Sequence, residues 1–537
     1  MMSTRERDIQ AWNEARKSTP ERMERAFEAL EEVRAGVEVF EAIKRHPLQG
    51  KGGGFIGKQM LVAAYRELVD LGDWDEDPAL LARIRMKPMR TLSGVTVVTV
   101  LTKPYPCPGK CIFCPTDVRM PKSYLPDEPG AMRALQHEFD PFTQVQARMD
   151  QFEAVGHPTD KIEFLVLGGT WSSYKRDYQE WFIRRMFEAL NGEESETLAE
   201  AQVLNEKASH RSVGLAIETR PDHVDTDELA WLRYLGVTKV QLGAQSFDDK
   251  ILELNKRGHG AAETLSAVDL LRAGGFKIVL HWMPNLLGAT PELDKADFLH
   301  FWESYCPDEI KIYPTQLLEN AELYLNWQAG EYHPYTTEEL IELIAEVKTS
   351  IPEYCRVNRV IRDIPSTNVV EGNKRTSLRM DVHKRMAELG TECRCLRCRE
   401  VRGAKVELDD LVLDDHRYQT PGAEEHFLSF VTPADKLAGF LRLSLPGEDA
   451  PKTGLADLEN AALIREVHVY GQSLEMGAEK SGAAQHIGLG TQLIEEAERI
   501  AREAGFQRMA VIAAIGTREY YAGRGFALGE SYMTKAL

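Results

Sequence analysis

The 537-residue sequence lacks any long hydrophobic run. Its longest apolar stretch, Gly94 to Leu101, is far shorter than the roughly 20 residues that a membrane-spanning helix needs. The first residues also lack the apolar segment that follows the charges of a secretory signal peptide. We therefore expect a cytoplasmic protein that makes no membrane contact.

Cysteine is scarce, and its eight residues are not distributed like a disulfide framework. Six of them lie in two tight clusters, which favours metal binding in a reducing compartment. The first cluster, Cys107, Cys111 and Cys114, has CxxxCxxC spacing, and no fourth Cys or His lies between Lys103 and His137 to complete a zinc site. Three thiolates are one fewer than a [4Fe–4S] cube normally takes from protein, so one iron is left for a small molecule to bind.

The second cluster, Cys393, Cys395 and Cys398, has CxCxxC spacing. This density of thiols predicts a structural zinc that joins two domains. The fourth ligand would come from elsewhere in the chain, with Cys306, Cys355 and His383 available. An auxiliary iron–sulfur cluster is the alternative interpretation.

A complete nucleotide-binding loop is missing. Gly52, Gly57 and Lys58 match GxxxxGK, but the next residue is Gln59, where Ser or Thr should hold magnesium. No apolar strand precedes the glycines either. We interpret this segment as a basic loop and exclude ATP binding there.

The chain also lacks an overall positive charge, since its net charge is −19. Residues 83–122 nevertheless hold eight Lys or Arg and one acid, and residues 356–405 hold thirteen Lys or Arg and six acids. Two basic segments on an acidic body indicate a restricted contact surface for a polyanion, or alternatively two solvated faces.

The hydrophobic periodicity changes along the chain. Residues 1–90 show three- and four-residue steps typical of helices. From about 91 to 320, short apolar runs alternate with helical stretches, which predicts an α/β fold with a partial (β/α)6 barrel. The expected barrel strands are Val95–Val100, Ile162–Leu167, Val213–Ile217, Lys239–Leu242, Lys277–His281 and Glu309–Ile312. A separate α/β unit follows, with strands expected at Leu437–Leu443, Arg465–Tyr470 and Met509–Ala513.

The CxxxCxxC loop resembles the signature of radical S-adenosylmethionine (SAM) enzymes. In that family the free iron holds SAM, and an electron cleaves it to a 5′-deoxyadenosyl radical. Gly168 and Gly169 match the family's glycine pair, which approaches the methionyl amino group of SAM, although Thr170 stands where an acid is usual. Glu218 and Gln245 are further expected SAM contacts by position, with strand capping as the alternative.

The last unit resembles the GNAT acetyltransferases. Its loop and helix start predict an acetyl-CoA pyrophosphate site in which backbone N–H groups hold the phosphates. The residues of this loop are Gln485, His486, Ile487, Gly488, Leu489, Gly490 and Thr491. The resemblance adds strand residues Glu466, Val467, His468 and Val469 as cofactor contacts. It also implies that Tyr520 or Tyr521 protonates the departing CoA thiolate, with core packing as the alternative.

A radical SAM domain joined to a GNAT-like domain resembles the catalytic-subunit family of Elongator, which modifies tRNA wobble uridines. Further marks include Arg90–Val95, Arg257-Gly258-His259 and Arg362–Pro365. The extra cysteines of the CxCxxC cluster depart from the eukaryotic pattern, so we expect a bacterial-type enzyme without obligate Elongator partner subunits.

The resemblance implies that the radical takes hydrogen from the methyl group of acetyl-CoA, the new radical adds to uridine carbon 5, and hydrolysis leaves a carboxymethyl group. By motif match Lys175 would contact acetyl-CoA, with a solvated side chain as the alternative, and an unidentified donor would supply electrons. The anticodon stem-loop of tRNA would contact the first basic segment, which predicts contacts from Arg83, Arg85, Lys87, Arg90, Lys103 and Lys110.

These patterns predict four domains: a helical region at 1–90, a radical SAM barrel at 91–350, a cysteine-containing linker at 351–408 and a GNAT-like domain at 409–537. Three competing interpretations remain. They are a protein lysine acetyltransferase with a structural radical SAM domain, a radical SAM enzyme of another substrate class, such as the porphyrinogen-oxidising type, and a non-enzymatic tRNA-binding module.

Overall fold

The computed structural model describes residues 18–49, 54–402, 406–470 and 488–537. The chain forms two compact units, one of residues 1–96 with 146–159 and one of residues 97–145 with 160–537. The division differs from the four predicted ranges, which stay a prediction.

The first unit is helical, as predicted. Its helices are α2 (Pro20–Arg34), α3 (Val39–Arg45), α4 (Lys58–Asp70) and α5 (Pro78–Ile84), followed by the C-terminal part of α7 (Pro141–Glu153). Pro20 and the Thr19 cap start α2, because Thr19 Oγ1 accepts a hydrogen bond from an N–H group that the helix leaves unpaired. The apolar faces of these helices meet in one core around Leu30, Leu61 and Leu80.

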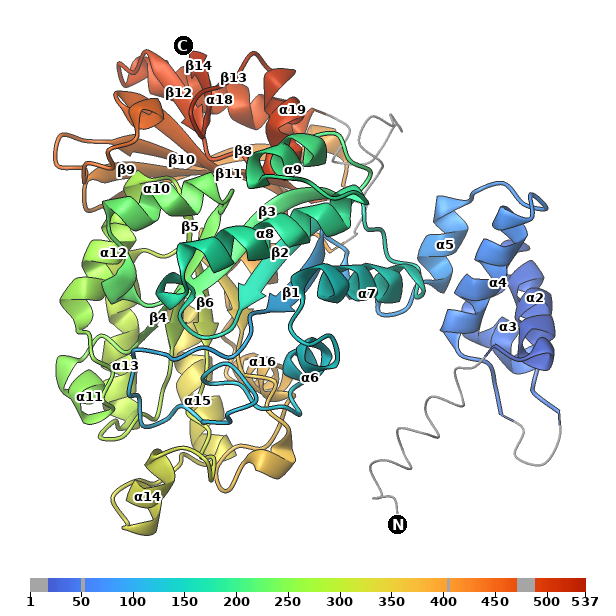
Figure 1. Ribbon diagram of the computed structural model, residues 1–537, viewed down its shortest axis with the longest axis horizontal. Coiled ribbons are helices and arrows are strands. Elements are labelled where there is room, and N and C mark those ends of the chain that lie inside the picture. Colours follow the sequence, from blue (N-terminus) through green and yellow to red (C-terminus); the bar gives the residue numbers. More distant parts are fainter. Residues whose placement is uncertain (1–17, 50–53, 403–405, 471–487) are drawn as a thin grey trace. The chain divides into compact units, whose positions relative to one another are not determined.

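The first sheet of the second unit is a seven-stranded partial barrel in the order β1 to β7 (Figure 1). Its strands are β1 (Thr96–Leu101), β2 (Lys161–Leu167), β3 (Arg211–Thr219), β4 (Lys239–Gln245), β5 (Lys277–Trp282), β6 (Glu309–Ile312) and β7 (Arg356–Arg359). Neighbours from β2 to β7 pair in parallel. The six predicted strands are confirmed, and β7 adds a seventh.

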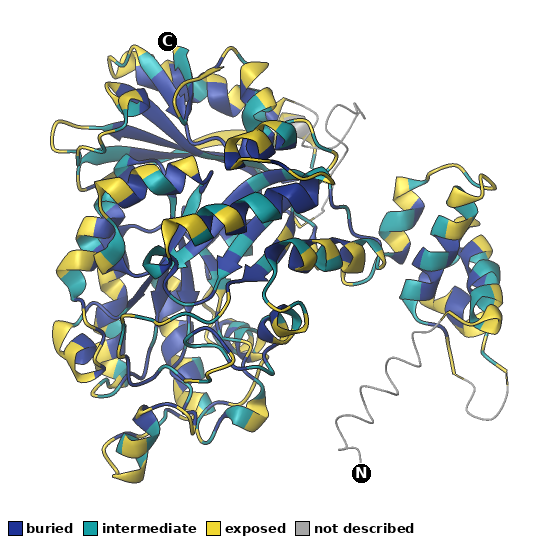
Figure 2. Ribbon diagram, viewed as in Figure 1, coloured by how far each residue is buried: buried dark blue, intermediate teal, exposed yellow. Residues whose placement is uncertain are grey.

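Helices connect these parallel strands, as a crossover connection requires. They are α6 (Pro129–Gln136), α8 (Arg176–Asn191), α9 (Leu198–Asn205), α10 (Thr226–Tyr234), α11 (Asp249–Leu254), α12 (Ala261–Ala273), α13 (Pro291–His300), α14 (Leu323–Gln328) and α15 (Thr337–Val347), with α16 (Leu378–Glu388) and α17 (Leu396–Arg399) after β7. The outer faces of these helices are exposed, whereas the strands of the barrel are largely buried (Figure 2).

The second sheet has the order β13-β14-β12-β11-β10-β9-β8. Its strands are β8 (Val412–Thr420), β9 (Ala423–Val431), β10 (Leu437–Pro446), β11 (Ala461–Val469), β12 (Arg508–Val511), β13 (Ala527–Leu528) and β14 (Met533–Ala536), with helices α18 (Leu489–Glu503) and α19 (Arg518–Ala522). All pairs are antiparallel except β11 with β12. The three predicted strands are confirmed as β10, β11 and β12.

Buried ion pairs join the second sheet to the barrel. Asp308, just before β6, pairs with Arg465 of β11 at 2.5 Å and with Arg442 of β10 at 3.4 Å, and all three side chains are buried. Lys277, the first residue of β5, pairs with Glu466 of β11 at 2.5 Å. The second sheet therefore packs against the N-terminal ends of barrel strands, opposite the ends where a barrel of this kind places its chemistry.

Candidate functional site

The first cysteine cluster lies in the loop that follows β1. Cys111 is buried, while Cys107 and Cys114 are partly exposed. The hydrogen bond between Cys111 and Cys114 lowers the pKa of Cys111 and raises that of Cys114, while the positive charge of Arg257 lowers the pKa of both. Ile112 and Phe113 pack into an apolar cluster with Leu317 and Leu323, which anchors the loop. Thiolate is the form that binds iron, so this environment suits a cluster ligand.

Two arginines flank the cysteine loop: Arg220 directly follows β3, and Arg257 lies between α11 and α12. Arg257 donates from Nη1 to Sγ of Cys111 at 3.5 Å and from Nε to the carbonyl of Gly243 at 3.2 Å. Arg220 is held by Asp222 through two hydrogen bonds of 2.8 and 2.7 Å and donates to the carbonyl of Arg257. A Cβ at Gly109 would lie 2.6 Å from Arg220, so glycine is what lets this arginine reach the loop.

The glycine pair after β2 adopts backbone conformations that only glycine adopts readily. Gly168 has φ +140° and Gly169 φ +89°. A Cβ at Gly168 would lie 1.8 Å from Oγ1 of Thr102. The adjacent Thr170 is buried, and its Oγ1 lies 3.6 Å from Sγ of Cys107. The structure thus brings the predicted SAM-contacting backbone next to the predicted cluster loop.

Glu218 is the second-last residue of β3. Its carboxylate is kept charged by His281, a residue that was not among the predicted site residues. Nδ1 of His281 lies 3.3 Å from its Oε1, and Tyr124 donates to its Oε2 at 3.2 Å. Burial alone would raise the pKa of Glu218, but His281 and the charges of Lys311 and Arg362 lower it to about 2. The sequence position of His281, near the C-terminal end of β5, was the signal that could have indicated this contact.

Gln245, at the end of β4, has the left-handed φ of +76°, which is uncommon for a residue other than glycine. Its Oε1 is buried, and among the described residues nothing hydrogen-bonds it. A buried polar atom in this position needs a partner. The anionic cysteine loop, the bare glycine backbone and this amide fit a [4Fe–4S] cluster with bound SAM.

In the second sheet, β12 pairs with β11 only as far as Ile464, whereas β11 continues along β10 to Val469. Because β12 itself ends at Val511, Val467 and His468 of β11 have no ladder partner on that side among the described residues. His468 is partly exposed as a residue, but its Nε2 is buried and no described residue hydrogen-bonds it; burial lowers its pKa to about 4. The predicted contact Glu466 is different, because its carboxylate binds Lys277 and Arg442 and leaves only its backbone for a cofactor.

Helix α18 begins where the acetyl-CoA loop is predicted to end. Gly488 caps it with φ +74°, and Leu489, Gly490 and Thr491 form its first turn. A Cβ at Gly490 would lie 2.6 Å from the hydroxyl of Tyr520, so the tyrosine reaches the helix N-terminus. Gln485, His486 and Ile487 lie outside the described residues.

The two candidate tyrosines differ in their surroundings. Tyr520 lies against Gly490, and the guanidinium of Arg524 stacks 3.6 Å from its ring centroid while donating to Oγ1 of Thr491 at 2.9 Å. Tyr521 is buried against Phe526, with ring centroids 5.8 Å apart. Tyr520 is therefore the tyrosine next to the predicted phosphate loop, and Tyr521 is a core residue.

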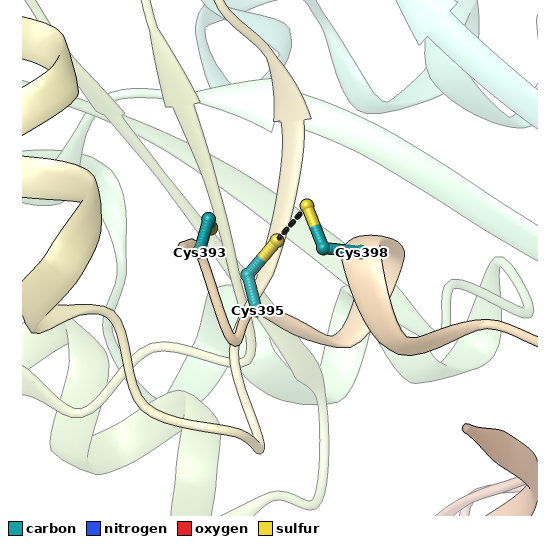
Figure 3. A group of neighbouring side chains, drawn as sticks. All are labelled: Cys393, Cys395 and Cys398. Atoms are coloured by element: carbon teal, nitrogen blue, oxygen red, sulfur yellow. Dashed lines mark hydrogen bonds between the residues drawn. The ribbon is translucent and has the colours of Figure 1, made fainter. Parts of the chain in front are cut away.

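The second cysteine cluster converges on one point (Figure 3). The sulfur atoms of Cys393, Cys395 and Cys398 all lie within 4.8 Å of one another, and those of Cys395 and Cys398 are 3.6 Å apart. Two sulfurs bound at about 2.3 Å to a tetrahedral zinc would be about 3.8 Å apart, which fits a single ion. Of the three possible fourth ligands, His383 has its Nε2 4.0 Å from Sγ of Cys398, whereas the thiol of Cys306 donates to the carbonyl of Trp302.

The predicted tRNA-contacting residues do not all have free side chains. Arg83 donates to the carbonyls of Val33 and Val37, and Arg85 donates to the carbonyl of Gly156. These two arginines therefore stabilise the first unit. Exposed side chains at the other predicted positions belong to Lys87 and Arg90 in the first unit and to Lys103 and Lys110 in the second.

Lys175 lies between the predicted SAM glycines and α8. It is exposed and caps the N-terminus of this helix. A cleft of about 720 Å³ opens along residues 108–110 of the cysteine loop. It is also lined by Arg220, Arg257 and His259. The Arg-Gly-His motif noted in the sequence is the wall of this cleft.

Two protein-family models match parts of the chain. Residues 105–299 match the model of the Radical SAM superfamily, and residues 307–388 match the Radical_SAM C-terminal domain. The tRNA uridine(34) acetyltransferase of Methanocaldococcus jannaschii is 42% identical over 488 residues, covering 88% of this chain and 90% of the relative. Elongator complex protein 3 of Dictyostelium discoideum is 38% identical, with 85% of each chain covered.

The chain belongs to the Elongator complex protein 3 family. A solved member, the archaeal Methanocaldococcus infernus Elp3 with an N-terminal deletion, superposes with a TM-score of 0.73 at 39% identity, covering 83% of this chain and 99% of that one. The predicted family and fold class are thereby confirmed. As a radical SAM domain, the barrel of this family member implies a [4Fe–4S] cluster and SAM. Among the described helices, none is long and apolar enough to cross a membrane.

Proposed function

We propose that the protein modifies the wobble uridine of tRNA by acetyl-CoA-dependent carboxymethylation at carbon 5. The observation that carries this proposal is the presence, in one chain, of a radical SAM barrel and a second sheet whose helix N-terminus fits an acetyl-CoA phosphate site. Relatives named tRNA uridine(34) acetyltransferase support the choice of substrate.

In the barrel, Cys107, Cys111 and Cys114 would hold the cluster, and Gly168, Gly169, Thr170, Glu218 and Gln245 would bind SAM. The bound cluster and SAM together would supply the 5′-deoxyadenosyl radical that takes hydrogen from the acetyl methyl group. Glu218 stays ionised because of His281, so it accepts hydrogen bonds from a ligand hydroxyl or amine. Arg257 and Arg220 keep positive charge beside the loop.

In the second sheet, residues Glu466 to Val469 and Gly488 to Thr491, with Gln485, His486 and Ile487, would bind acetyl-CoA. Backbone N–H groups at the start of α18 suit the pyrophosphate. Tyr520 would donate a proton to the CoA thiolate, since its hydroxyl reaches the helix N-terminus and burial raises its pKa, which keeps it protonated. Lys175 would contact acetyl-CoA from the barrel.

Zinc bound by Cys393, Cys395 and Cys398, with His383 as the fourth ligand, would hold the segment after β7. Hydrogen bonds with Cys393 and Cys398 lower the pKa of Cys395, and the charge of Lys348, whose buried Nζ has no hydrogen-bond partner among the described residues, acts in the same direction. The unidentified electron donor would approach through the cleft beside residues 108–110, because this cleft reaches the cysteine loop from outside.

The primary test measures anaerobic acetyl-CoA hydrolysis with and without tRNA. We expect the rate to rise sharply with tRNA, and SAM with dithionite to yield carboxymethyluridine detectable by mass spectrometry of RNA digests. Turnover with a basic peptide and no response to tRNA would instead support a protein lysine acetyltransferase.

A second test addresses tRNA contact. Replacing both Lys87 and Arg90 by Glu should weaken tRNA binding and reduce the salt dependence of log K by about one per lost phosphate contact. Lys44→Glu, an exposed lysine of α3 outside the basic segment, is the matched control. Unchanged tRNA affinity in the double variant would exclude this contact surface.

A further inference from the structure

Four aromatic side chains form a continuous stack beside the cysteine loop. The ring centroids of Tyr105 and Tyr174 are 4.7 Å apart, those of Tyr174 and Tyr178 5.3 Å, and those of Tyr178 and Trp181 5.6 Å. The interplanar angles are 29° and 24° for the two tyrosine pairs, which are stacked, and 33° for Tyr178 with Trp181, whose ring is tilted. We call these four residues the aromatic stack.

The inner part of the stack is attached to the predicted SAM site. Tyr105 lies two residues before Cys107. The hydroxyl of Tyr174 is 2.8 Å from Oγ1 of Thr102 and donates to the carbonyl of Gly168 at 3.0 Å. The stack therefore begins at the mouth of the barrel, between the cysteine loop and the glycine pair, and continues along the first turns of α8.

The outer part of the stack is accessible and carries positive charge. Trp181 is 37% exposed on the surface of α8. Nζ of Lys103 lies 4.6 Å from the ring centroid of Tyr178, and the exposed Lys175 precedes the same helix turn. Burial raises the pKa of Tyr178 to about 12, so its hydroxyl remains neutral and does not repel an anion.

Packing alone accounts for the inner rings but not for the outer one. Tyr174 is buried and contacts Trp171, as an ordinary core residue does. Trp181 instead ends the stack at the surface, next to Tyr178, whose ring is the one that Lys103 contacts. Planar aromatic faces combined with cations are what single-stranded nucleic acids contact, because every base has a face that can stack and a phosphate that needs a cation.

We propose that the aromatic stack is a platform on which an unpaired base of the anticodon loop stacks while the neighbouring uridine enters the barrel. This inference rests on the proposed function and adds a base-binding surface to it. Lys103 binds the adjacent phosphate, and Trp181 supplies the accessible ring face. The platform favours single-stranded loops over duplexes, since paired bases do not expose their faces.

The test measures binding of an anticodon stem-loop RNA to the full-length protein by fluorescence anisotropy at several salt concentrations. Trp181→Ala should weaken binding about tenfold, in the range found for loss of one base-stacking residue. Trp181→Phe should restore most of the affinity. The salt dependence should stay unchanged, because the substitution removes no phosphate contact. Unchanged affinity in Trp181→Ala would overturn the proposal.

Controls separate stacking from loss of structure. Trp181→Leu keeps an apolar side chain at this position of α8 but has no aromatic face. This variant should bind as weakly as Trp181→Ala while unfolding at the wild-type temperature. Tyr234→Ala removes another exposed aromatic ring, which stacks on Trp231 instead. An equal loss of affinity in Tyr234→Ala would overturn the proposal, because the effect would then not be specific to the stack.

The same experiment distinguishes failure of the platform from failure of the proposed function. If the wild-type protein binds the stem-loop and Trp181→Ala binds it equally well, the platform is excluded and tRNA remains the substrate. If the wild-type protein binds neither stem-loop nor tRNA, the proposed function fails and the platform fails with it. A blunt RNA duplex of equal charge should bind wild type and Trp181→Ala with the same affinity.

Discussion

Nη1 of Arg257 lies 3.5 Å from Sγ of Cys111, and the arginine is buried. Its charge acts on the cysteine from within the protein, where water screens it little. Hydrogen bonds to ligand sulfurs are among the factors that set the reduction potential of an iron–sulfur cluster. This contact thus connects Arg257 of the Arg-Gly-His motif with the reduction potential of the cluster site.

Replacing Arg257 by Met should lower the midpoint potential of the bound cluster. The reduced cluster carries one more negative charge, and the variant lacks the cation that stabilises it. We expect a fall of about 60 mV, which is a tenfold change in a one-electron equilibrium. Potentiometric titration followed by electron paramagnetic resonance measures it. Arg257→Lys should retain part of the potential, and Lys256→Met, at the exposed neighbour that pairs with Glu322, should leave it unchanged.

Tyr520 and Tyr521 should respond differently to loss of the hydroxyl. Tyr520→Phe should reduce tRNA-stimulated acetyl-CoA hydrolysis about a hundredfold, the lower range for loss of a general acid. Tyr521→Phe should stay near the wild-type rate, since Tyr521 packs against Phe526 away from Gly490. The measurement is kcat at saturating acetyl-CoA. A similar loss in both variants would contradict the assignment.

The second cysteine cluster should hold zinc. Cys395→Ser and His383→Ala should each lower the zinc content of the purified protein below about one ion per chain, because a tetrahedral site loses one of its four ligands. Both should also lower the unfolding temperature. Elemental analysis gives the metal content, and Cys306→Ser is the control, since this buried thiol bonds to Trp302. Iron in place of zinc would show the auxiliary iron–sulfur cluster.

Removing Asp308 should strongly destabilise the second unit. Asp308→Ala leaves Arg465 and Arg442 buried without their shared partner, and loss of one member of a buried ion pair costs about 3–5 kcal/mol. Asp363→Ala breaks an exposed pair with Arg359 and should cost below about 1 kcal/mol. Urea unfolding measures both free energies. Equal effects of the two substitutions would refute the buried pairing.

Glu309, inside the barrel, should contribute to acid unfolding. Burial alone would raise its pKa, but Lys239 and Lys277 lower it from 4.5 to about 2. A carboxyl with a depressed folded-state pKa stabilises the fold above its unfolded pKa and loses that contribution as the pH falls through the folded value. The stability gap between wild type and Glu309→Gln should therefore be full at pH 7 and shrink between pH 4.5 and 2. The exposed Glu303→Gln should show no such trend.

Most strands with apolar runs were predicted from the sequence, although β9 was missed, and the polar strands β7 and β8 were not predicted. β7 reads Arg-Val-Asn-Arg, because its side chains bind Glu309 and Glu400 instead of packing in an apolar core. β8, an edge strand with Asp414, Asp415 and Arg417, has no hydrophobic alternation to reveal it. Periodicity detects burial among apolar side chains, so strands that are buried by charge pairing or lie at an edge escape it.

At the candidate site, residue type and spacing identified the cysteines and glycines but not what surrounds them. His281, Tyr124 and Arg257 come from segments far apart in the sequence and meet Glu218 or Cys111 only in the folded chain. The sequence also could not show that the guanidinium groups of Arg83 and Arg85 donate to backbone carbonyls; their predicted contact with tRNA stays a prediction.

The charges that join barrel and second sheet cancel one another: Asp308, Glu425 and Glu466 face Arg442, Arg465 and Lys277. The barrel contributes Asp308 and Lys277, whose partners Arg442, Arg465 and Glu466 all lie on the second sheet. A chimera with a second sheet from another protein should therefore be stable only if that sheet supplies an arginine opposite Asp308 and a carboxylate opposite Lys277.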